Sequence, residues 1–440
     1  MPPTSAPERS EEIVARLSAA CRTGRYRSLE WRTEQLSRLR DLLRDHAEDF
    51  AAALHTDLRK SRTEAYAAEI GFTIREIDHI LVNLAQWLRP VPVAVTGCPP
   101  GSTAHLQYDP LGVVLVMAPW NYPVQLLLVP AAGALAAGNA VVAKPSEVAP
   151  ACSALMARLI PRYLDTDAVA VVEGGVAEAT ALLAQRFDHV FYTGNGVVGR
   201  IVMRAAAEHL TPVTLELGGK TPVFVDRGTC LEVTAARLAR AKFANAGQTC
   251  VAPDYVLTDP ETARALEAEL SRAIEKLFGK APEDSREYGR IINLRHFDRI
   301  ARLLGSGRIV VGGGHDRESR FIAPTVLADV VADSPVMQEE IFGPVLPIVE
   351  VPGVNEAIAF INERHKPLAV YGFTGSSEIR RRLAEETASG SLVLGLPMAQ
   401  VLGPGLPFGG VGQSGMGSYR GAHSLAAFSH RKTVLEVPER

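Results

Sequence analysis

The stretch His189–Gly199, HVFYTGNGVVG, decides the fold class of this 440-residue chain. Its first part, His189–Tyr192, is a short apolar run typical of a buried strand, and Gly194–Gly199 then follows the pattern G-x-G-x-x-G before a helical stretch. Glycines at such a turn let the backbone approach a pyrophosphate, which then lies at the helix N-terminus. This fingerprint normally follows the first strand of a dinucleotide-binding sheet, whereas the strand here is about the fourth. By itself the motif therefore leaves a cofactor turn and a plain structural turn equally open.

The alternation of strands and helices continues on the N-terminal side of this stretch. Apolar, β-branched runs at Gly112–Met117, Ala140–Ala143 and Ala168–Val172 are separated by helical stretches such as Pro150–Tyr163 and Ala177–Gln185. Near-continuous apolar strands that alternate with helices indicate a parallel sheet covered on both faces. The sequence therefore predicts an α/β fold.

A second α/β series follows a joint near Leu217-Gly218-Gly219. Its helices include Glu261–Phe278 and Ser376–Thr387, and its expected strands are Pro222–Val225, Ile309–Val311, Val345–Val351 and Ala369–Phe373. A chain of this length is expected to form two or three domains or lobes.

The first ninety residues have helical periodicity instead. We expect helices over Glu11–Cys21 and Ser28–Leu54, and a third that starts at the capping box Ser61–Glu64 and runs to about Trp87. The segment Val91–Tyr108 then predicts two short strands around the turn Pro99-Pro100-Gly101.

Composition excludes several classes of function. The net charge of −3 gives no basic surplus for nucleic acid, and no apolar run is long enough to span a bilayer. The polar start Met1–Ser10 and the C-terminus predict neither a signal peptide nor a lipid anchor. The five cysteines are scattered and odd in number, which argues against a disulfide framework or a metal site and favours a reducing, cytoplasmic location.

Cys250 is the cysteine whose surroundings are unusual. It ends the run Asn245–Cys250, NAGQTC, in which a turn could expose the thiol, and a helix beginning near Cys250 would lower the pKa of that thiol. No histidine lies close in sequence, so a Cys–His hydrolase is not indicated. The other four, Cys21, Cys98, Cys152 and Cys230, are interpreted as small buried hydrophobes.

Other polar residues have both a functional and a structural interpretation. Glu216 ends an apolar strand, where it could pair with Lys220 or remain in an apolar setting that raises its pKa toward that of a general base. Asn121, held between prolines and aromatics, could be an oxyanion donor or a turn residue. Lys144 and Glu147 could bind a ribose or phosphate, or could belong to a helix start capped by Ser146. The acidic pair Glu339–Glu340 before a tight turn is more typical of a solvated surface.

Together these stretches resemble one family. The matching stretches are Pro119–Pro123, Lys144–Glu147, Tyr192–Asn195, Leu215–Lys220, Gly247–Tyr255, Glu339–Pro344 and Pro407–Gly417. In this order they resemble the aldehyde dehydrogenase superfamily, and the runs HLTPVTLELGGK (209–220) and GQTCVAPDYV (247–256) resemble its class 3 branch. The resemblance extends over nearly the whole chain.

The resemblance implies a role for each matching residue. Cys250 would be the nucleophile, Asn121 an oxyanion donor together with the Cys250 backbone N–H, and Glu216 the base that activates water. Lys144, Ser146 and Glu147 would lie at the adenosine ribose. Gly194, Asn195 and Gly199 would lie near the pyrophosphate, with Asn195 where many members carry Ser, and Glu340 and Phe342 would position the nicotinamide ribose and ring.

The resemblance also implies an architecture and partners. It implies a Rossmann-like cofactor domain (1–90 and 109–217), an α/β catalytic domain (218–416) and a small β extension for oligomerisation (91–108 and 417–440). The cofactor would be NAD, favoured because Glu147 repels a 2′-phosphate, with NADP also possible. The substrate would be a small-molecule aldehyde, and the protein a homodimer without nucleic acid or membrane partners.

One segment departs from the family pattern and keeps alternatives open. In Ser391–Gly405, Gly395 stands where an Asn is expected, and the run that follows is rich in Gly and Pro. This segment is expected to form part of the substrate funnel. The alternatives are a CoA-acylating aldehyde dehydrogenase, a catalytically silent protein of the same fold that binds the cofactor, and a thiol esterase. Glu216 argues against the first, because transfer to CoA needs no water-activating base.

Overall fold

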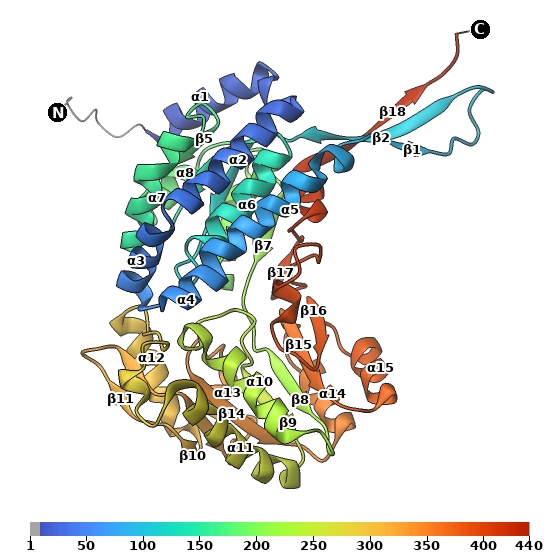
Figure 1. The fold of residues 1–440 in the computed structure, drawn as a ribbon. Helices are drawn as coiled ribbons and strands as arrows, with labels where there is room; N and C mark the ends of the chain where they lie inside the picture. Colours follow the sequence, from blue (N-terminus) through green and yellow to red (C-terminus); the bar gives the residue numbers. More distant parts are fainter. Residues whose placement is uncertain (1–8, 440) are drawn as a thin grey trace, which may run out of the picture.

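The computed structural model describes residues 9–439, which form two lobes and a projecting β arm (Figure 1). Most of the stretch Met1–Ser10, for which no signal peptide is expected, lies outside the described residues. Across residues 9–439, no helix combines the length and the apolar character needed to cross a membrane.

The first lobe is built on a six-stranded sheet with the order β17-β7-β6-β3-β4-β5. Strands β3 (Val113–Met117), β4 (Ala140–Lys144), β5 (Val169–Val171), β6 (His189–Thr193) and β7 (Val213–Glu216) are parallel to their neighbours. Every residue of β3, β4 and β6 is buried, as near-continuous apolar strands predict. The predicted parallel α/β sheet is therefore confirmed, and β17 (Gly415–Met416) adds an antiparallel edge.

Helices cover this sheet and include the N-terminal helices. They are α1 (Ser10–Arg22), α2 (Leu29–Asp45), α3 (Ala47–Leu58), α5 (Gly71–Trp87), α6 (Gln125–Ala136), α7 (Pro150–Tyr163), α8 (Val176–Leu183) and α9 (Gly196–Ala207). The single helix predicted over 28–54 is wrong, because the chain leaves helical geometry at His46 (φ −113°, ψ 23°) between α2 and α3.

The helix predicted from Ser61 is also interrupted. It consists of α4 (Arg62–Ala65), a π-helical turn η2 (Tyr66–Ile70) and α5. The Ser61 Oγ accepts from the Glu64 N–H at 3.0 Å, which is half of the predicted capping box. The Glu64 carboxylate does not complete the box, because it accepts the Asn245 backbone N–H at 2.6 Å from the other lobe.

The second lobe holds a seven-stranded sheet with the order β10-β13-β14-β9-β8-β15-β16. Its strands are β8 (Pro222–Val225), β9 (Tyr255–Thr258), β10 (Arg308–Val311), β13 (Thr325–Ala328), β14 (Val345–Glu350), β15 (Ala369–Phe373) and β16 (Ser391–Leu394). All neighbours are parallel except β10, which pairs antiparallel with β13. Helices α10 (Leu231–Phe243), α11 (Pro260–Phe278), α14 (Val354–Asn362) and α15 (Ser377–Glu386) pack in this lobe.

The β arm is a three-stranded antiparallel sheet with the order β1-β2-β18. Strands β1 (Val91–Val93) and β2 (Thr103–Pro110) are the two predicted around the Pro99–Gly101 turn, and β18 (Ser429–Glu436) pairs with β2 along its whole length. The arm projects away from both lobes (Figure 1).

The crossing between the lobes positions the site. The chain leaves the carboxyl end of β7 at Glu216 and enters the amino end of β8 at Pro222. The carboxyl edge of the first sheet therefore faces the amino edge of the second. The residues that follow β3, β4, β6 and β7 all emerge at that face, where ligands of open parallel sheets bind.

Candidate active site

Cys250 lies in a loop between the lobes with an unusual backbone. The short helical turn η3 (Ala244–Gly247) precedes it, and three consecutive residues, Asn245 (φ 50°), Ala246 (φ 50°) and Gly247 (φ 74°), are left-handed. The expected helix near Cys250 is wrong: the residues after it form a turn that leads into β9. A Cβ at Gly247 would lie 2.2 Å from the Gly343 carbonyl oxygen, so this glycine lets the Cys250 loop touch the turn that holds Phe342.

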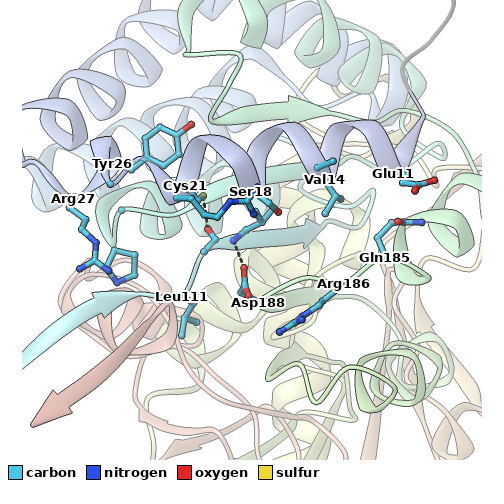
Figure 2. A pocket seen from close by; sticks show the side chains of 17 residues that line it. Glu11, Val14, Ser18, Cys21, Tyr26, Arg27, Leu111, Gln185, Arg186 and Asp188 are labelled. Atoms are coloured by element: carbon cyan, nitrogen blue, oxygen red, sulfur yellow. Dashed lines mark hydrogen bonds between the residues drawn. The ribbon is translucent and has the colours of Figure 1, made fainter.

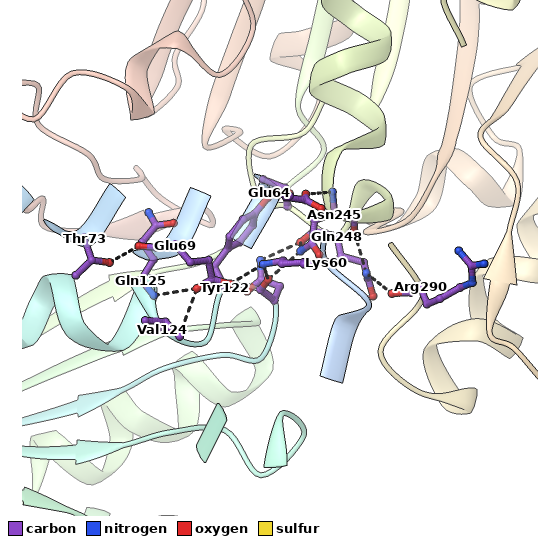
Figure 3. A network of polar contacts seen from close by, with 12 residues as sticks. Lys60, Glu64, Glu69, Thr73, Tyr122, Val124, Gln125, Asn245, Gln248 and Arg290 are labelled. Atoms are coloured by element: carbon purple, nitrogen blue, oxygen red, sulfur yellow. Dashed lines mark hydrogen bonds and ion pairs between the residues drawn. The ribbon is translucent and has the colours of Figure 1, made fainter. Parts of the chain in front are cut away.

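A buried polar network holds this loop against Asn121 (Figure 3). The Asn121 carbonyl accepts from Lys60 Nζ and from Asn245 Nδ2, both at 2.8 Å. Asn121 Nδ2 and Asn245 Nδ2 donate to the Gln248 carbonyl at 3.0 and 3.1 Å. An amide nitrogen carries two N–H groups, so Asn121 retains one N–H beyond its bond to Gln248.

The Lys60 ammonium is a fully buried cation of this network, and its partner Glu69 is equally buried. The ammonium donates to Glu69 Oε1 at 2.6 Å and lies 3.8 Å from the Tyr122 ring centroid. Glu69 Oε2 in turn accepts the backbone N–H groups of Val124 and Gln125, each at 3.0 Å. Burial raises the pKa of Glu69 and Lys60 opposes that shift. The sequence did not identify Lys60 or Glu69, because a lysine beside Ser61-Arg62 looks like an ordinary surface residue.

Glu216 occupies the apolar setting that was one of its two predicted alternatives. The predicted pairing with Lys220 is wrong, because Lys220 Nζ donates to Asp254 Oδ2 at 2.5 Å. Both carboxylate oxygens of Glu216 are buried and have no hydrogen-bond partner in the described residues. Burial alone raises the pKa of Glu216 well above its ordinary value. A carboxylate in this state can take a proton from water.

Cys250 is half-buried and lines the cavity described below. Burial, together with the Glu340 and Glu216 carboxylates, raises the pKa of Cys250 to about 12, and the backbone N–H groups of Cys250 and Val251 oppose the shift. Both side chains are therefore close enough to interact electrostatically with the sulfur.

Glu340 is not the solvated acid expected from the pair Glu339–Glu340. It is half-buried, and burial, followed by the charge of Asp254, raises its pKa to about 8. A Cβ at Gly218 would lie 2.0 Å from Glu340 Oε2, so the interlobe joint passes directly beside this carboxylate. Phe342 (φ 46°) packs edge-on against Trp120, with ring centroids 5.4 Å apart.

The remaining predicted residues lie at the carboxyl edge of the first sheet. Lys144 Nζ is 3.6 Å from Glu147 Oε2 and donates to the Gly174 carbonyl at 2.6 Å, and burial lowers the pKa of Lys144. Ser146 is buried, but its predicted capping of the next helix is wrong: α7 begins at Pro150, and Ser146 Oγ accepts from the Val148 N–H.

The G-x-G-x-x-G turn opens helix α9. Asn195 caps the helix by accepting from the Val197 and Val198 N–H groups, both at 3.0 Å. The turn starts beside Glu216, whose carbonyl accepts the Gly194 N–H at 3.0 Å, and a Cβ at Gly199 would lie 2.9 Å from the Leu217 side chain.

This edge fits a dinucleotide. Thr193 Oγ1, immediately before Gly194, is buried without a hydrogen-bond partner, and the N-terminus of α9 favours an anion. Lys144 and Glu147 supply a cation and an acceptor for a sugar and phosphate. Residues 9–439 contain no group of three or more His, Cys, Asp or Glu side chains that could hold a metal ion.

A cavity of about 720 Å³ opens onto Cys250. It is lined by residues of α5, α10, the Cys250 loop and the predicted funnel segment, and also by Tyr122, Phe408 and Tyr419. The wall is mostly apolar, and Arg237, Arg240, Glu64 and Glu232 add charge to it. The cavity suits an uncharged organic substrate.

Another cavity, of about 560 Å³, lies beneath α1 and contains none of the predicted site residues (Figure 2). Its cysteine, Cys21, donates to the Gly112 carbonyl at 3.6 Å, and burial raises the pKa of its thiol. Cys152 is buried as predicted. The same prediction is wrong for Cys98 and Cys230, which are exposed because they lie in the loop between β1 and β2 and at the start of α10.

Comparison with known proteins adds independent findings. The family model described as "Aldehyde dehydrogenase family" matches residues 2–434. The dimeric NADP-preferring aldehyde dehydrogenase of Canis lupus familiaris is 46% identical over 427 residues, covering 97% of this chain and 94% of its own. Aldehyde dehydrogenase family 3 member A2 of Macaca fascicularis is 47% identical, with coverages of 97% and 88%. A substrate-bound structure of Staphylococcus aureus AldH superposes with a TM-score of 0.96 at 40% identity, covering 99% of this chain and 95% of that one.

The buried ion pair predicts a stability effect. Replacing Lys60 by Met leaves the Glu69 carboxylate buried and unpaired, so we expect the free energy of unfolding to fall by about 3–5 kcal/mol in urea denaturation. The matched control is Arg38→Met, which breaks the exposed pair with Glu34 (2.6 Å) and should cost about 0–1 kcal/mol. If the free energy of unfolding fell equally in the two variants, Lys60 would have no special structural role.

The raised pKa of Cys250 predicts that the alkylation of its thiol depends on pH. Below a pKa of about 12 the thiolate fraction of Cys250 rises about tenfold per pH unit, so its alkylation by iodoacetamide should accelerate steadily from pH 7 to 10. Peptide mapping of the cofactor-free protein measures this rate, with free cysteine, whose pKa is about 8.5, as the reference. If the alkylation rate of Cys250 reached a plateau below pH 9, the pKa of its thiol would not be raised.

Proposed function

The chain belongs to the aldehyde dehydrogenase family and is an NAD(P)-dependent aldehyde dehydrogenase; on this premise we propose that Cys250 is its covalent nucleophile and Glu216 its water-activating base. The observation that carries the proposal is the mostly apolar cavity that opens onto the Cys250 thiol. Glu216, a carboxylate without hydrogen-bond partners in the described residues, acts electrostatically on that thiol. The findings favour neither a CoA-acylating enzyme nor a catalytically silent protein.

The first half of the reaction forms a bond to sulfur. The Cys250 thiolate attacks the aldehyde carbon, and the carbonyl oxygen becomes the oxyanion of a thiohemiacetal. The second N–H of the Asn121 amide and the Cys250 backbone N–H are proposed to donate to this oxygen. Loss of one such donor typically costs about 2.7–4 kcal/mol of transition-state stabilisation. NAD(P)⁺, when bound, supplies the acceptor for the hydride that leaves this carbon, after which the sulfur carries a thioester.

The second half releases the acid. Glu216 takes a proton from a water molecule as the water oxygen attacks the thioester carbon. The carbon–sulfur bond then breaks, the carboxylic acid leaves and the Cys250 thiolate is restored. The raised pKa of Glu216 suits this role, because a carboxylate of ordinary pKa is a weak base.

The cofactor site is proposed to comprise the residues at the carboxyl edge of the first sheet. Lys144, Ser146 and Glu147 would hold the adenosine ribose; Gly194, Asn195 and Gly199 the pyrophosphate; and Glu340 and Phe342 the nicotinamide half. The charge of Glu147 favours NAD over NADP, whereas the canine relative's name states a preference for NADP. The Lys144–Glu147 contact at 3.6 Å weakens the repulsion, so use of both cofactors is consistent with this geometry.

The central prediction concerns turnover. NADH and NADPH formation, followed by absorbance over a panel of aliphatic and aromatic aldehydes, should occur with the wild type and be lost in Cys250→Ala. Glu216→Gln should keep a single burst of reduced cofactor while its steady-state rate falls about 10²–10⁴-fold, because only thioester hydrolysis needs the base. Running each cofactor separately tests the preference assigned to Glu147.

Two outcomes would overturn these assignments. Steady turnover by Cys250→Ala at the wild-type rate would remove Cys250 as nucleophile. Loss of the burst as well as the steady state in folded Glu216→Gln would place Glu216 before the hydride step.

We also propose the domain division and assembly implied by the resemblance. Residues 1–90 with 109–217 would form the cofactor domain, 218–416 the catalytic domain, and 91–108 with 417–440 an oligomerisation extension of a cytoplasmic homodimer. The β arm supports this proposal, because its strands expose Val91, Val93 and Leu435, and the canine relative is named as dimeric. The free, scattered cysteines support a reducing compartment.

Light scattering tests the assembly. The wild type should have the mass of two chains, and Leu435→Asp with Val93→Asp should shift it toward one chain, because charged side chains disfavour burial in an interface. Val82→Asp, at an 82% exposed position on α5, is the matched control. A wild-type mass of one chain would contradict the homodimer.

A further inference from the structure

The wall segment Leu396–Leu402 forms one side of the cavity but has little structure of its own. Leu396, Pro397, Met398, Val401 and Leu402 all line the cavity. Between β16 and β17 the segment contains only the short turn η6 (Ala399–Val401), and Met398 is left-handed (φ 65°). The position of the segment therefore depends on side chains that reach it from other elements.

Gln400 connects the wall segment to the nucleophile loop. Its side chain is 7% exposed, and its Nε2 donates to the Tyr371 hydroxyl at 3.1 Å. The Tyr371 hydroxyl in turn donates to the Val251 carbonyl at 2.7 Å. Tyr371 is fully buried in β15, and Val251 follows Cys250 directly. Two hydrogen bonds thus separate the cavity wall from the backbone next to the sulfur.

Arg420 fixes the same segment from the opposite side. Its Nη1 donates to the Val401 carbonyl at 2.9 Å, and its Nη2 lies 3.4 Å from Glu76 Oε2. Glu76 Oε1 also accepts the Gly421 N–H at 2.6 Å. Arg420 is buried and left-handed (φ 87°), a conformation that costs of order 1–3 kcal/mol and persists only where the surroundings enforce it.

A third contact fixes the start of the wall. Arg237, on α10, donates from Nη1 to the Gly395 carbonyl at 2.7 Å. Gly395 is left-handed (φ 85°) at the position where an Asn was expected. The segment that departs from the family pattern is therefore held by hydrogen bonds from three separate elements.

We propose that Gln400 and Arg420 are positioning residues that determine which sizes of aldehyde the enzyme accepts. Arg420 holds the outer part of the wall segment against α5, and Gln400 couples the wall to the Cys250 loop through Tyr371. A long aldehyde contacts the wall along its chain, whereas a short one reaches the sulfur without it. This inference rests on the proposed function of Cys250.

Kinetics with a short and a long aldehyde test the proposal. In Gln400→Met and in Arg420→Met, kcat/KM for octanal should fall roughly tenfold through a higher KM, while kcat/KM for propanal and the KM for the cofactor stay within about threefold. Tyr371→Phe should lower kcat/KM for both aldehydes, because it also frees the Val251 carbonyl. Arg420→Lys, which keeps the charge, should recover part of the octanal activity and serves if Arg420→Met does not fold.

A double variant tests the coupling. Because Gln400 acts through the Tyr371 hydroxyl, the octanal-to-propanal ratio of Gln400→Met/Tyr371→Phe should equal that of Tyr371→Phe alone. Additive losses, or an unchanged ratio in both Gln400→Met and Arg420→Met, would overturn the proposal. Matched controls are Gln185→Met, which removes an amide hydrogen bond of 3.2 Å to the Ala181 carbonyl of α8, and the exposed Arg381→Met.

A second readout separates this proposal from the proposed function. The alkylation rates of Cys250 with iodoacetamide and with N-octyl iodoacetamide report access past the wall without any turnover. If no aldehyde is oxidised but Gln400→Met and Arg420→Met change the ratio of these rates, the proposed function fails and the wall assignment stands. If Cys250-dependent oxidation occurs and neither kinetics nor alkylation depends on the two residues, only the wall assignment fails.

Discussion

The Asn121 carbonyl oxygen joins the two lobes at the site. It accepts two buried donors, the Lys60 ammonium and the Asn245 amide, each at 2.8 Å. Removing Lys60 would leave the buried Glu69 carboxylate without its cation and the carbonyl with a single donor, which costs more than the hydrogen bonds contribute when made. The same bonds hold the left-handed residues Asn245 and Ala246, whose conformations cost of order 1–3 kcal/mol each. The position of the Cys250 loop relative to Asn121 therefore depends on this network.

Burial dominates the electrostatics around the sulfur. Burial is the largest cause of the raised pKa of Glu216, Cys250 and Glu340 alike. Lys220, the cation nearest to Glu216 in sequence, is instead engaged by Asp254 and by the Val336 and Glu339 carbonyls. Pairing Glu216 with Lys220 would stabilise the carboxylate and lower its basicity. The geometry thus leaves Glu216 without a pairing cation, as its proposed role as a base requires.

The parts that the sequence predicted are those that follow from local pattern. Buried parallel strands show as continuous apolar runs, so β3, β4 and β6 could be placed to within a residue or two. Glu216 and Cys250 could be singled out because strand ends and Gly-rich turns carry chemistry. Lys60 could not, because its partner Asn121 is 61 residues away and nothing local marks the lysine as buried. The helix expected near Cys250 does not form. The chain approaches the thiol through three left-handed residues, and tertiary hydrogen bonds to Asn245 hold that path.

Two arginines at the cavity wall, Arg237 and Arg420, bind groups of the protein itself, and this affects which substrates the cavity can accept. Arg420 is a buried cation that pairs with Glu76 at 3.4 Å, donates to the Val401 carbonyl and lies over the Phe72 ring. Arg237 likewise donates a hydrogen bond to the Gly395 carbonyl. These arginines therefore organise the backbone of the wall and are already engaged before any ligand enters. An anionic aldehyde would have to compete with these contacts and would approach the carboxylates Glu216 and Glu340, whereas an uncharged chain gains from the apolar lining at no such cost. The mostly apolar lining consequently favours the chain of a neutral aldehyde.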